Sequence, residues 1–185
     1  LCSSGLNAQA ALYPAQARRL AADDSSDKVA AIRQITQTAD PDAVRILKAM
    51  AEDTLFLAGD KVVIVDGDHA FDAASGAPIK APVDPESITV NNRIRGELAG
   101  ALAALKLFDA DVAVRLASAQ KLQSNVSADM APLLARALDK ETDSRIKELL
   151  TLAHAQANLG NADPAARLAA VKALAETSSP TIKSV

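Results

Sequence analysis

Three aspartates and a histidine lie in one short segment, and their types and spacing could bind a metal ion. They are Asp66, Asp68, His69 and Asp72. An Asp-x-Asp spacing can present carboxylates to a hard cation such as calcium. However, Asp66-Gly67-Asp68 is also an ordinary hairpin turn, and no glutamate follows at the distance that an EF-hand loop requires. We therefore interpret the segment as a turn, expect His69 to be exposed, and predict no metal or other cofactor.

A second polar segment, Asn91-Asn92-Arg93-Ile94-Arg95, combines two amides and two guanidinium groups. It follows a predicted strand and begins a predicted helix, for which Asn92 is the expected N-cap. Arg93 and Arg95 fall in the first turn, where a positive charge is unfavourable beside the N-terminal end of the helix dipole. Acidic residues of the preceding segment should compensate them, and the candidates are Asp66, Asp68, Asp84 and Glu86. We expect a structural clamp here, and the alternative is contact with a polar ligand or a protein partner.

Other catalytic arrangements have little support in the sequence. It contains no Gly-x-Ser-x-Gly motif and no phosphate-binding loop, and its single cysteine, Cys2, has no candidate histidine partner. His154 lies near Leu150 and Leu152 at helical spacing, so we expect it to be half-buried on a helix. Two histidines without a cysteine partner do not support a zinc site. We predict that the protein is not an enzyme.

A submotif that occurs three times indicates that helices of a repeated unit make up much of the chain and position the residues discussed above. Each copy has an aspartate, a cation four residues later and apolar residues at helical spacing. The aspartate and cation are Asp24 and Lys28 in copy one, Asp111 and Arg115 in copy two, and Asp163 and Arg167 in copy three. The pattern is typical of the first helix of a HEAT-like α-α repeat. The two charges can form an ion pair worth about 0.2–0.5 kcal/mol, so we interpret them as structural.

The spacing of the copies leaves room for an insertion, because copies one and two are 87 positions apart and copies two and three only 52. Residues 54–91 contain short β-branched runs bounded by turns, which predict two or three strands, at 55–57, 61–65 and 88–90. Residues 71–87 are expected to be loop or an extended edge. The predicted fold class is therefore mostly α, a HEAT-like right-handed α-α stack (an α-solenoid) with a small β-hairpin or sheet insertion.

Helical periodicity predicts the remaining elements. The expected helices are at 14–22, 27–37, 42–53, 92–107, 111–124, 129–140, 143–159 and 164–176. Ser179-Pro180 in copy three matches Asp40-Pro41 in copy one, where a second helix begins. Copy three thus ends early, and we expect the natural protein to continue beyond Val185.

The chain is divided into four parts within one domain. Residues 1–10 end in Ala-Gln-Ala, a small-x-small pattern of the kind that signal peptidase cleaves, and are interpreted as a signal-peptide remnant. A disordered tail is the alternative. Residues 11–53 contain the N-terminal helices and the first helix pair, residues 54–91 the β insertion, and residues 92–185 the other helices with the truncated last repeat.

The composition excludes several kinds of partner. The net charge is −3 and the cations are scattered singly, so we expect no nucleic-acid footprint. Aromatic residues make up only 2%, which leaves no stacking platform for bases or sugars. No apolar run reaches the ~18 residues of a membrane span, so contact with a membrane is expected only through a segment absent from this sequence.

The order of these parts resembles the N-terminal extramembrane region of the urea-type ABC-transporter permease, in the branched-chain amino-acid permease family. The matching segments are Lys61-Val62-Val63-Ile64, Val90-Asn91-Asn92-Arg93-Ile94-Arg95, Phe108-Asp109-Ala110-Asp111 and residues 163–174. The similarity covers most of the chain after about residue 20. The membrane spans of that family are not present here, so the chain corresponds to the soluble region alone.

The resemblance implies a non-catalytic domain on the periplasmic face of the bacterial inner membrane that supports urea uptake. Its expected partners are other subunits of an ABC transporter, so that the domain docks the solute-binding protein or braces the membrane part. The expected contact residues are Asn91, Asn92, Arg93 and Arg95, with the hairpin around Asp66 and Asp68. The second hypothesis is a free-standing HEAT-like scaffold that binds a protein partner. A third is an enzyme that acts on a small molecule or depends on a metal.

Overall fold

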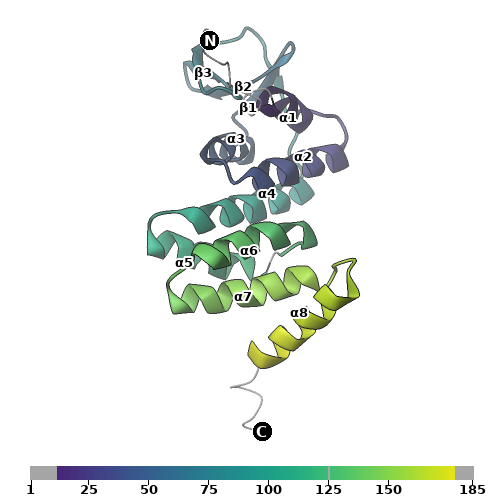
Figure 1. Ribbon diagram of the computed structural model, residues 1–185. Coiled ribbons are helices and arrows are strands. Elements are labelled where there is room, and N and C mark those ends of the chain that lie inside the picture. The colour runs from purple at the N-terminus through teal and green to yellow at the C-terminus, as the bar shows by residue number, and fades with distance from the viewer. Residues whose placement is uncertain (1–11, 125, 178–185) are drawn as a thin grey trace, which may run out of the picture. The chain divides into compact units, whose positions relative to one another are not determined.

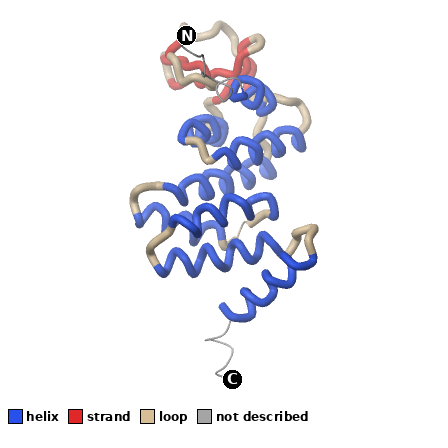
Figure 2. The backbone as a smooth tube through the Cα atoms, viewed as in Figure 1, coloured by secondary structure: helices blue, strands red, loops and turns tan. Residues whose placement is uncertain are grey.

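The computed structural model describes residues 12–124 and 126–177. The predicted signal-peptide remnant and the Ser179-Pro180 motif lie outside the described residues. The described part of the chain has eight α-helices and a small antiparallel sheet (Figure 2). The prediction of a mostly α fold with a small β insertion is thereby confirmed. The chain divides into two compact units, residues 1–99 and 100–185, and each is described by itself.

Three helices open the first unit: α1 (Leu12–Leu20), α2 (Ser25–Thr38) and α3 (Pro41–Ala51). The carboxylates of Asp24 and Asp40 cap α2 and α3 by accepting hydrogen bonds from backbone N–H groups of the first turns. These N–H groups have no partner within the helix, so the caps fix where each helix begins. Apolar side chains of α2 and α3 are fully buried, among them Ile32, Ile35, Ile46, Leu47 and Met50.

The sheet of the first unit has five antiparallel strands in the order β4-β3-β2-β1-β5. The strands are β1 (Leu55–Ala58), β2 (Lys61–Asp66), β3 (His69–Asp72), β4 (Pro78–Ile79) and β5 (Glu86–Ser87). Gly59 and Gly67 turn the chain between the first three strands with φ of 59° and 58°, which glycine adopts without a steric penalty. α1 lies against β2, and α3 contacts β1 (Figure 1).

The predicted strand at 88–90 is wrong. The chain pairs with β1 at Glu86–Ser87 and then leaves the sheet. The Ile88 side chain is buried, and the Thr89 carbonyl accepts a hydrogen bond from Lys28 Nζ at 2.9 Å. Because a lysine binds that carbonyl, the Thr89 carbonyl is satisfied without a neighbouring strand. The segment 71–87, predicted to be loop or edge, contains the end of β3 and the short strands β4 and β5.

The boundary between the units falls inside α4 (Asn92–Leu105). The second unit continues with α5 (Val112–Leu122), α6 (Ala131–Lys140), α7 (Ser144–Asn158) and α8 (Pro164–Thr177). Helices α5, α6 and α8 all pack on α7, which α8 crosses at an angle (Figure 1). All eight predicted helices are present with ends within two residues of those expected. In the described part of the chain, no helix is long and apolar enough to cross a membrane.

Copies two and three of the submotif have the same local structure. Asp111 and Asp163 cap α5 and α8 by accepting hydrogen bonds from the backbone N–H two residues later. Arg115 and Arg167 each donate from Nη1 to the carbonyls six and five residues earlier. The expected ion pair between the aspartate and the cation is wrong for the described residues. Because each carboxylate serves as a cap, the arginine turns back to the carbonyls of the preceding loop.

Candidate functional site

The junction between the sheet and α4 depends on a cap that the Asn91 side chain supplies. Asn91 Oδ1 accepts a hydrogen bond from Ile94 N at 3.0 Å, and Asn91 O accepts one from Arg95 N at 2.9 Å. The prediction that Asn92 caps the helix is therefore wrong by one residue, since α4 begins at Asn92. The Asn92 side chain is exposed and makes no hydrogen bond with another described residue.

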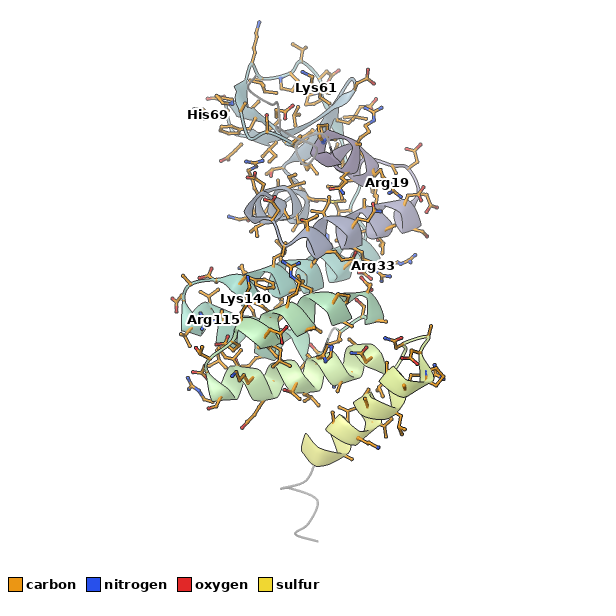
Figure 3. The ribbon with its side chains drawn as sticks, viewed as in Figure 1. Arg19, Arg33, Lys61, His69, Arg115 and Lys140 are labelled. Atoms are coloured by element: carbon orange, nitrogen blue, oxygen red, sulfur yellow. The ribbon has the colours of Figure 1, made fainter. Side chains whose placement is uncertain are left out.

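The starts of α2 and α4 lie side by side within the first unit. Asn91 Nδ2 donates a hydrogen bond to Ser25 Oγ at 2.9 Å. Further along both helices, Arg33 and Glu97 form a bidentate ion pair with N–O distances of 2.7 and 3.2 Å. Figure 3 shows Arg33 on α2 in this position. Two helix N-termini therefore present the positive ends of their dipoles at one surface.

Arg95 is held by the connection between α3 and β1. Its Nη2 atom lies 2.9 and 3.2 Å from the two carboxylate oxygens of Asp53, and Nη1 donates to Ala51 O at 3.4 Å. The compensating carboxylate is thus Asp53, which lies 42 positions earlier in the sequence. The prediction that an acidic residue of the segment before the junction neutralises the Arg95 charge is therefore wrong. In the described part of the chain, no hydrogen bond or ion pair joins the junction to the candidates Asp66, Asp68, Asp84 and Glu86.

The hairpin aspartates lie elsewhere on the sheet. Asp66 ends β2 and lines a groove of about 400 Å³ together with Arg45, Lys48 and Glu52 of the α3 region. Asp68 is exposed in the turn between β2 and β3. Among the described residues, Asp66 and Asp68 thus make no hydrogen bond or ion pair with the junction, and the hairpin is a separate feature.

Arg93 differs from every other arginine in the described residues. It alone makes no hydrogen bond, ion pair or ring contact with another described residue. The pKa of Asp24 is lowered chiefly by hydrogen bonds from the backbone of Ser26 and Asp27, and the Arg93 charge lowers it further. An unpaired guanidinium at a helix start is electrostatically unfavourable, and a carboxylate from a partner would relieve it.

The residues first considered for metal binding serve other roles. Asp72 Oδ1 accepts hydrogen bonds from Ala74 N, Ser75 N and Ser75 Oγ. Burial raises the pKa of Asp72, but the bonds from Ser75 outweigh it and hold the pKa below its usual value. His69 is exposed, as expected, and His154 is half-buried beside Asn158. Among the described residues, no three histidine, cysteine or acidic side chains are grouped to hold a metal ion.

A second groove of about 650 Å³ lies between α1, the turn from α2 to α3, and the sheet. Three of its four carboxylates are bound in local structure: Asp40 caps α3, Asp42 pairs with Arg45 at 3.2 Å, and Asp72 holds the following turn. The fourth, Asp60, is exposed and lies 3.7 Å from Arg18. Although burial raises the pKa of Asp72, the bonds from Ser75 hold it below its usual value, so Asp72 is poorly suited to act as a general acid near neutral pH.

An ion pair in the second unit escaped the sequence-based expectations. Arg115 Nε and Nη2 lie 2.8 and 3.1 Å from Glu141 Oε2 and Oε1, and the Glu141 side chain is only 2% exposed. The bond from Arg115 lowers the pKa of Glu141 to about 2, although burial raises it. Figure 3 shows Arg115 and its neighbour Lys140 at the same end of the helices. The only signal in the sequence is an acidic residue directly after a predicted helix.

Two side chains of the junction, Asn92 and Arg93, are exposed and make no hydrogen bond with another described residue. Asn92 and Arg93 present hydrogen-bond donors beside two helix N-termini, and this arrangement suits an acidic group. Comparisons of the chain with protein-family models, curated proteins and solved structures found no significant match.

Proposed function

We propose that this chain is the non-catalytic, extracytoplasmic domain of a urea ABC-transporter permease, on the periplasmic face of the bacterial inner membrane. We further propose that it docks the solute-binding protein through Asn92 and Arg93. The transporter class rests on the resemblance carried by residues 90–95 and by the repeated submotif. The choice of contact residues rests on the geometry of the junction.

One observation carries the docking proposal: Arg93 is exposed and makes no hydrogen bond or ion pair with another described residue, whereas Arg95, two residues later, is bound to Asp53. An arginine placed against a helix dipole, with no carboxylate hydrogen-bonded to it among the described residues, is best accounted for by a partner that supplies one. Arginine is also enriched at the energetic centres of protein interfaces, because its guanidinium binds carboxylates through two hydrogen bonds. The partner face is therefore expected to be acidic.

The helices are proposed to form a HEAT-like stack. The support is the shared geometry of α5 and α8, in which an aspartate caps the helix and an arginine binds two loop carbonyls. These two copies are 52 positions apart, somewhat more than the roughly 40–47 residues of a HEAT or armadillo repeat. Stacked repeats present extended surfaces to protein partners, which agrees with a docking role.

The affinity of the chain for the solute-binding protein of its transporter tests the docking proposal. We expect Arg93→Glu to weaken binding at least about tenfold in titration calorimetry, because it places a negative charge against an acidic face. Lys80→Glu is the matched control, since Lys80 is an exposed cation in the loop between β4 and β5.

Circular dichroism would show that both variants remain folded. Equal binding by the wild type and Arg93→Glu would contradict the docking role. A loss of the same size with Lys80→Glu would show that only net charge matters, and would also contradict it.

A further inference from the structure

A lysine near the start of α2 is buried without an acidic partner among the described residues. Lys28 is only 6% exposed, and its Nζ atom donates one hydrogen bond to a described residue, to Thr89 O at 2.9 Å. An ammonium group has three donors, so two of them have no partner in the described part of the chain. No ion pair joins Lys28 to a described carboxylate. Burial of a charge is costly unless an opposite charge and hydrogen bonds compensate it.

The other two copies of the submotif show how a cation at this position is compensated. Arg115 is the equivalent of Lys28 in copy two, and it binds the buried carboxylate of Glu141 through two hydrogen bonds. Arg167 is the equivalent in copy three, and it is exposed, so water can solvate its charge. Lys28 combines the burial of the first with the missing carboxylate of the second. An anionic group beside its ammonium would complete copy one as Glu141 completes copy two.

A pocket of about 300 Å³ adjoins Lys28 within the first unit. It lies between the connection from α1 to α2 and the segment that contains β5 and the residues after it. Two carboxylates, those of Asp23 and Glu86, also line the pocket, and both residues are exposed. The pocket therefore offers one buried positive charge and two exposed negative charges. Its apolar lining comes from Ala21, Ala22, Leu57 and Ile88.

The segments outside the described residues offer no acidic side chain for this pocket. Residues 1–11 and 178–185 contain no aspartate or glutamate. The two acids that line the pocket form no ion pair with Lys28. A bound molecule is therefore the source of the anionic group that the buried ammonium requires.

We propose that this pocket binds a small zwitterion, with its carboxylate on Lys28 and its positive group beside Asp23 and Glu86. A dianion such as phosphate is a poorer occupant, because the two acids repel its second charge. A simple monocarboxylate would bind Lys28 but leave both acids without a partner. The inference does not depend on the transporter assignment, since neither Asn92 nor Arg93 lines the pocket.

The probes are glycine, β-alanine and γ-aminobutyrate, which are zwitterions with increasing separation between the two charges. Each is titrated into the full 185-residue chain, labelled with nitrogen-15, and followed by the NMR shifts of the backbone amides. We expect at least one of them to shift the amides of Ala22 and Ile88 saturably. Acetate and inorganic phosphate should bind at least about tenfold more weakly, because each lacks the positive group.

Two variants with matched controls assign the charges. Lys28→Met keeps the length of the side chain but removes its charge, and it should weaken binding of the zwitterion at least about tenfold. Its control is Lys80→Met, at an exposed lysine that does not line the pocket. Glu86→Gln should weaken binding of the zwitterion about threefold or more without weakening that of acetate. Its control is Asp84→Asn, at an exposed acid that does not line the pocket.

Several outcomes would overturn the proposal. One is the absence of saturable shifts with all three zwitterions up to about 50 mM, which would show that water alone solvates Lys28. Another is acetate or phosphate that binds as tightly as the best zwitterion. Binding that survives in a folded Lys28→Met chain would exclude the ammonium as the contact. If that variant does not fold, the ligand series and Glu86→Gln still decide, because neither changes Lys28.

Discussion

At the residue scale, the charged side chains of this protein differ in what they contribute. Arg115 and Glu141 are largely shielded from water and joined by two hydrogen bonds, so the removal of one partner leaves a poorly solvated charge. Arg18 and Asp60 lie 3.7 Å apart with the Asp60 side chain fully exposed, where an ion pair contributes little. The stability of the second unit should therefore depend on Glu141 far more than that of the first depends on Asp60.

Glu141→Gln tests this contrast. We expect it to lower the free energy of unfolding by about 2–3 kcal/mol, because Arg115 loses its buried carboxylate. Guanidinium chloride unfolding monitored by circular dichroism measures the change. Asp60→Asn is the control, for which we expect a change below about 0.5 kcal/mol. Similar losses of unfolding free energy in the two variants would show that burial does not determine how much the Arg115–Glu141 pair contributes to stability.

The pH dependence of stability gives a second test of the same pair. The pKa of Glu141 in the folded chain is about 2, against an ordinary value of 4.5. Because folding lowers this pKa, the contribution is complete above about 4.5 and is lost as the pH falls toward 2. The stability difference between wild type and Glu141→Gln should therefore shrink between about pH 5 and pH 2. A difference that stays constant over this range would contradict the assignment.

At the element scale, aspartate caps set where the helices of the repeat begin. Asp111→Ala should lower the free energy of unfolding by about 1 kcal/mol, because a backbone N–H of the first turn of α5 loses its acceptor. Asp111→Asn keeps an oxygen acceptor at this position and should restore most of the loss in the same unfolding measurement. If Asp111→Asn were as unstable as Asp111→Ala, the negative charge of Asp111, and not its hydrogen bond to the first turn, would be the source of its contribution to stability.

Two glycines give opposite expectations for one and the same substitution. A Cβ atom at either Gly67 or Gly96 would meet no other atom within 4 Å, so only the backbone conformation decides. Gly96 lies inside α4, and Gly96→Ala should stabilise the protein by about 0.5–1 kcal/mol. Gly67 has φ of 58°, so Gly67→Ala should destabilise it by about 1 kcal/mol. Thermal unfolding measures both, and a change of the same sign would contradict this account.

Helices could be predicted from the sequence better than strands. Periodic apolar residues and aspartate caps are local signals, and they placed the ends of all eight helices within two residues. The strand expected at 88–90 failed because its β-branched residues are held by tertiary contacts: Ile88 is buried and the Thr89 carbonyl binds Lys28. The five-stranded order was also not predictable, since β4 and β5 have only two residues each.

At the scale of the whole molecule, the sequence identified the junction but not the partners of its residues. A structural clamp or a partner contact was expected for the whole segment 91–95, and the structure shows Asn91 and Arg95 bound within the first unit. Asp53 and Ser25 were not predicted as their partners, because contacts between positions 42 and 66 residues apart leave no trace in local spacing. That Arg93 makes no hydrogen bond or ion pair with another described residue follows only from the structure, which shows its charge acting on Asp24 from a distance.

The central claim, that Asn92 and Arg93 contact the solute-binding protein, is tested most directly by photocrosslinking in the intact transporter. A photoreactive phenylalanine analogue replaces Asn92, whose side chain is exposed and makes no hydrogen bond with another described residue. The same analogue replaces Lys80 as the control. We predict an adduct with the solute-binding protein from position 92 and none from position 80. No adduct from position 92, or equal adducts from both positions, would contradict the claim.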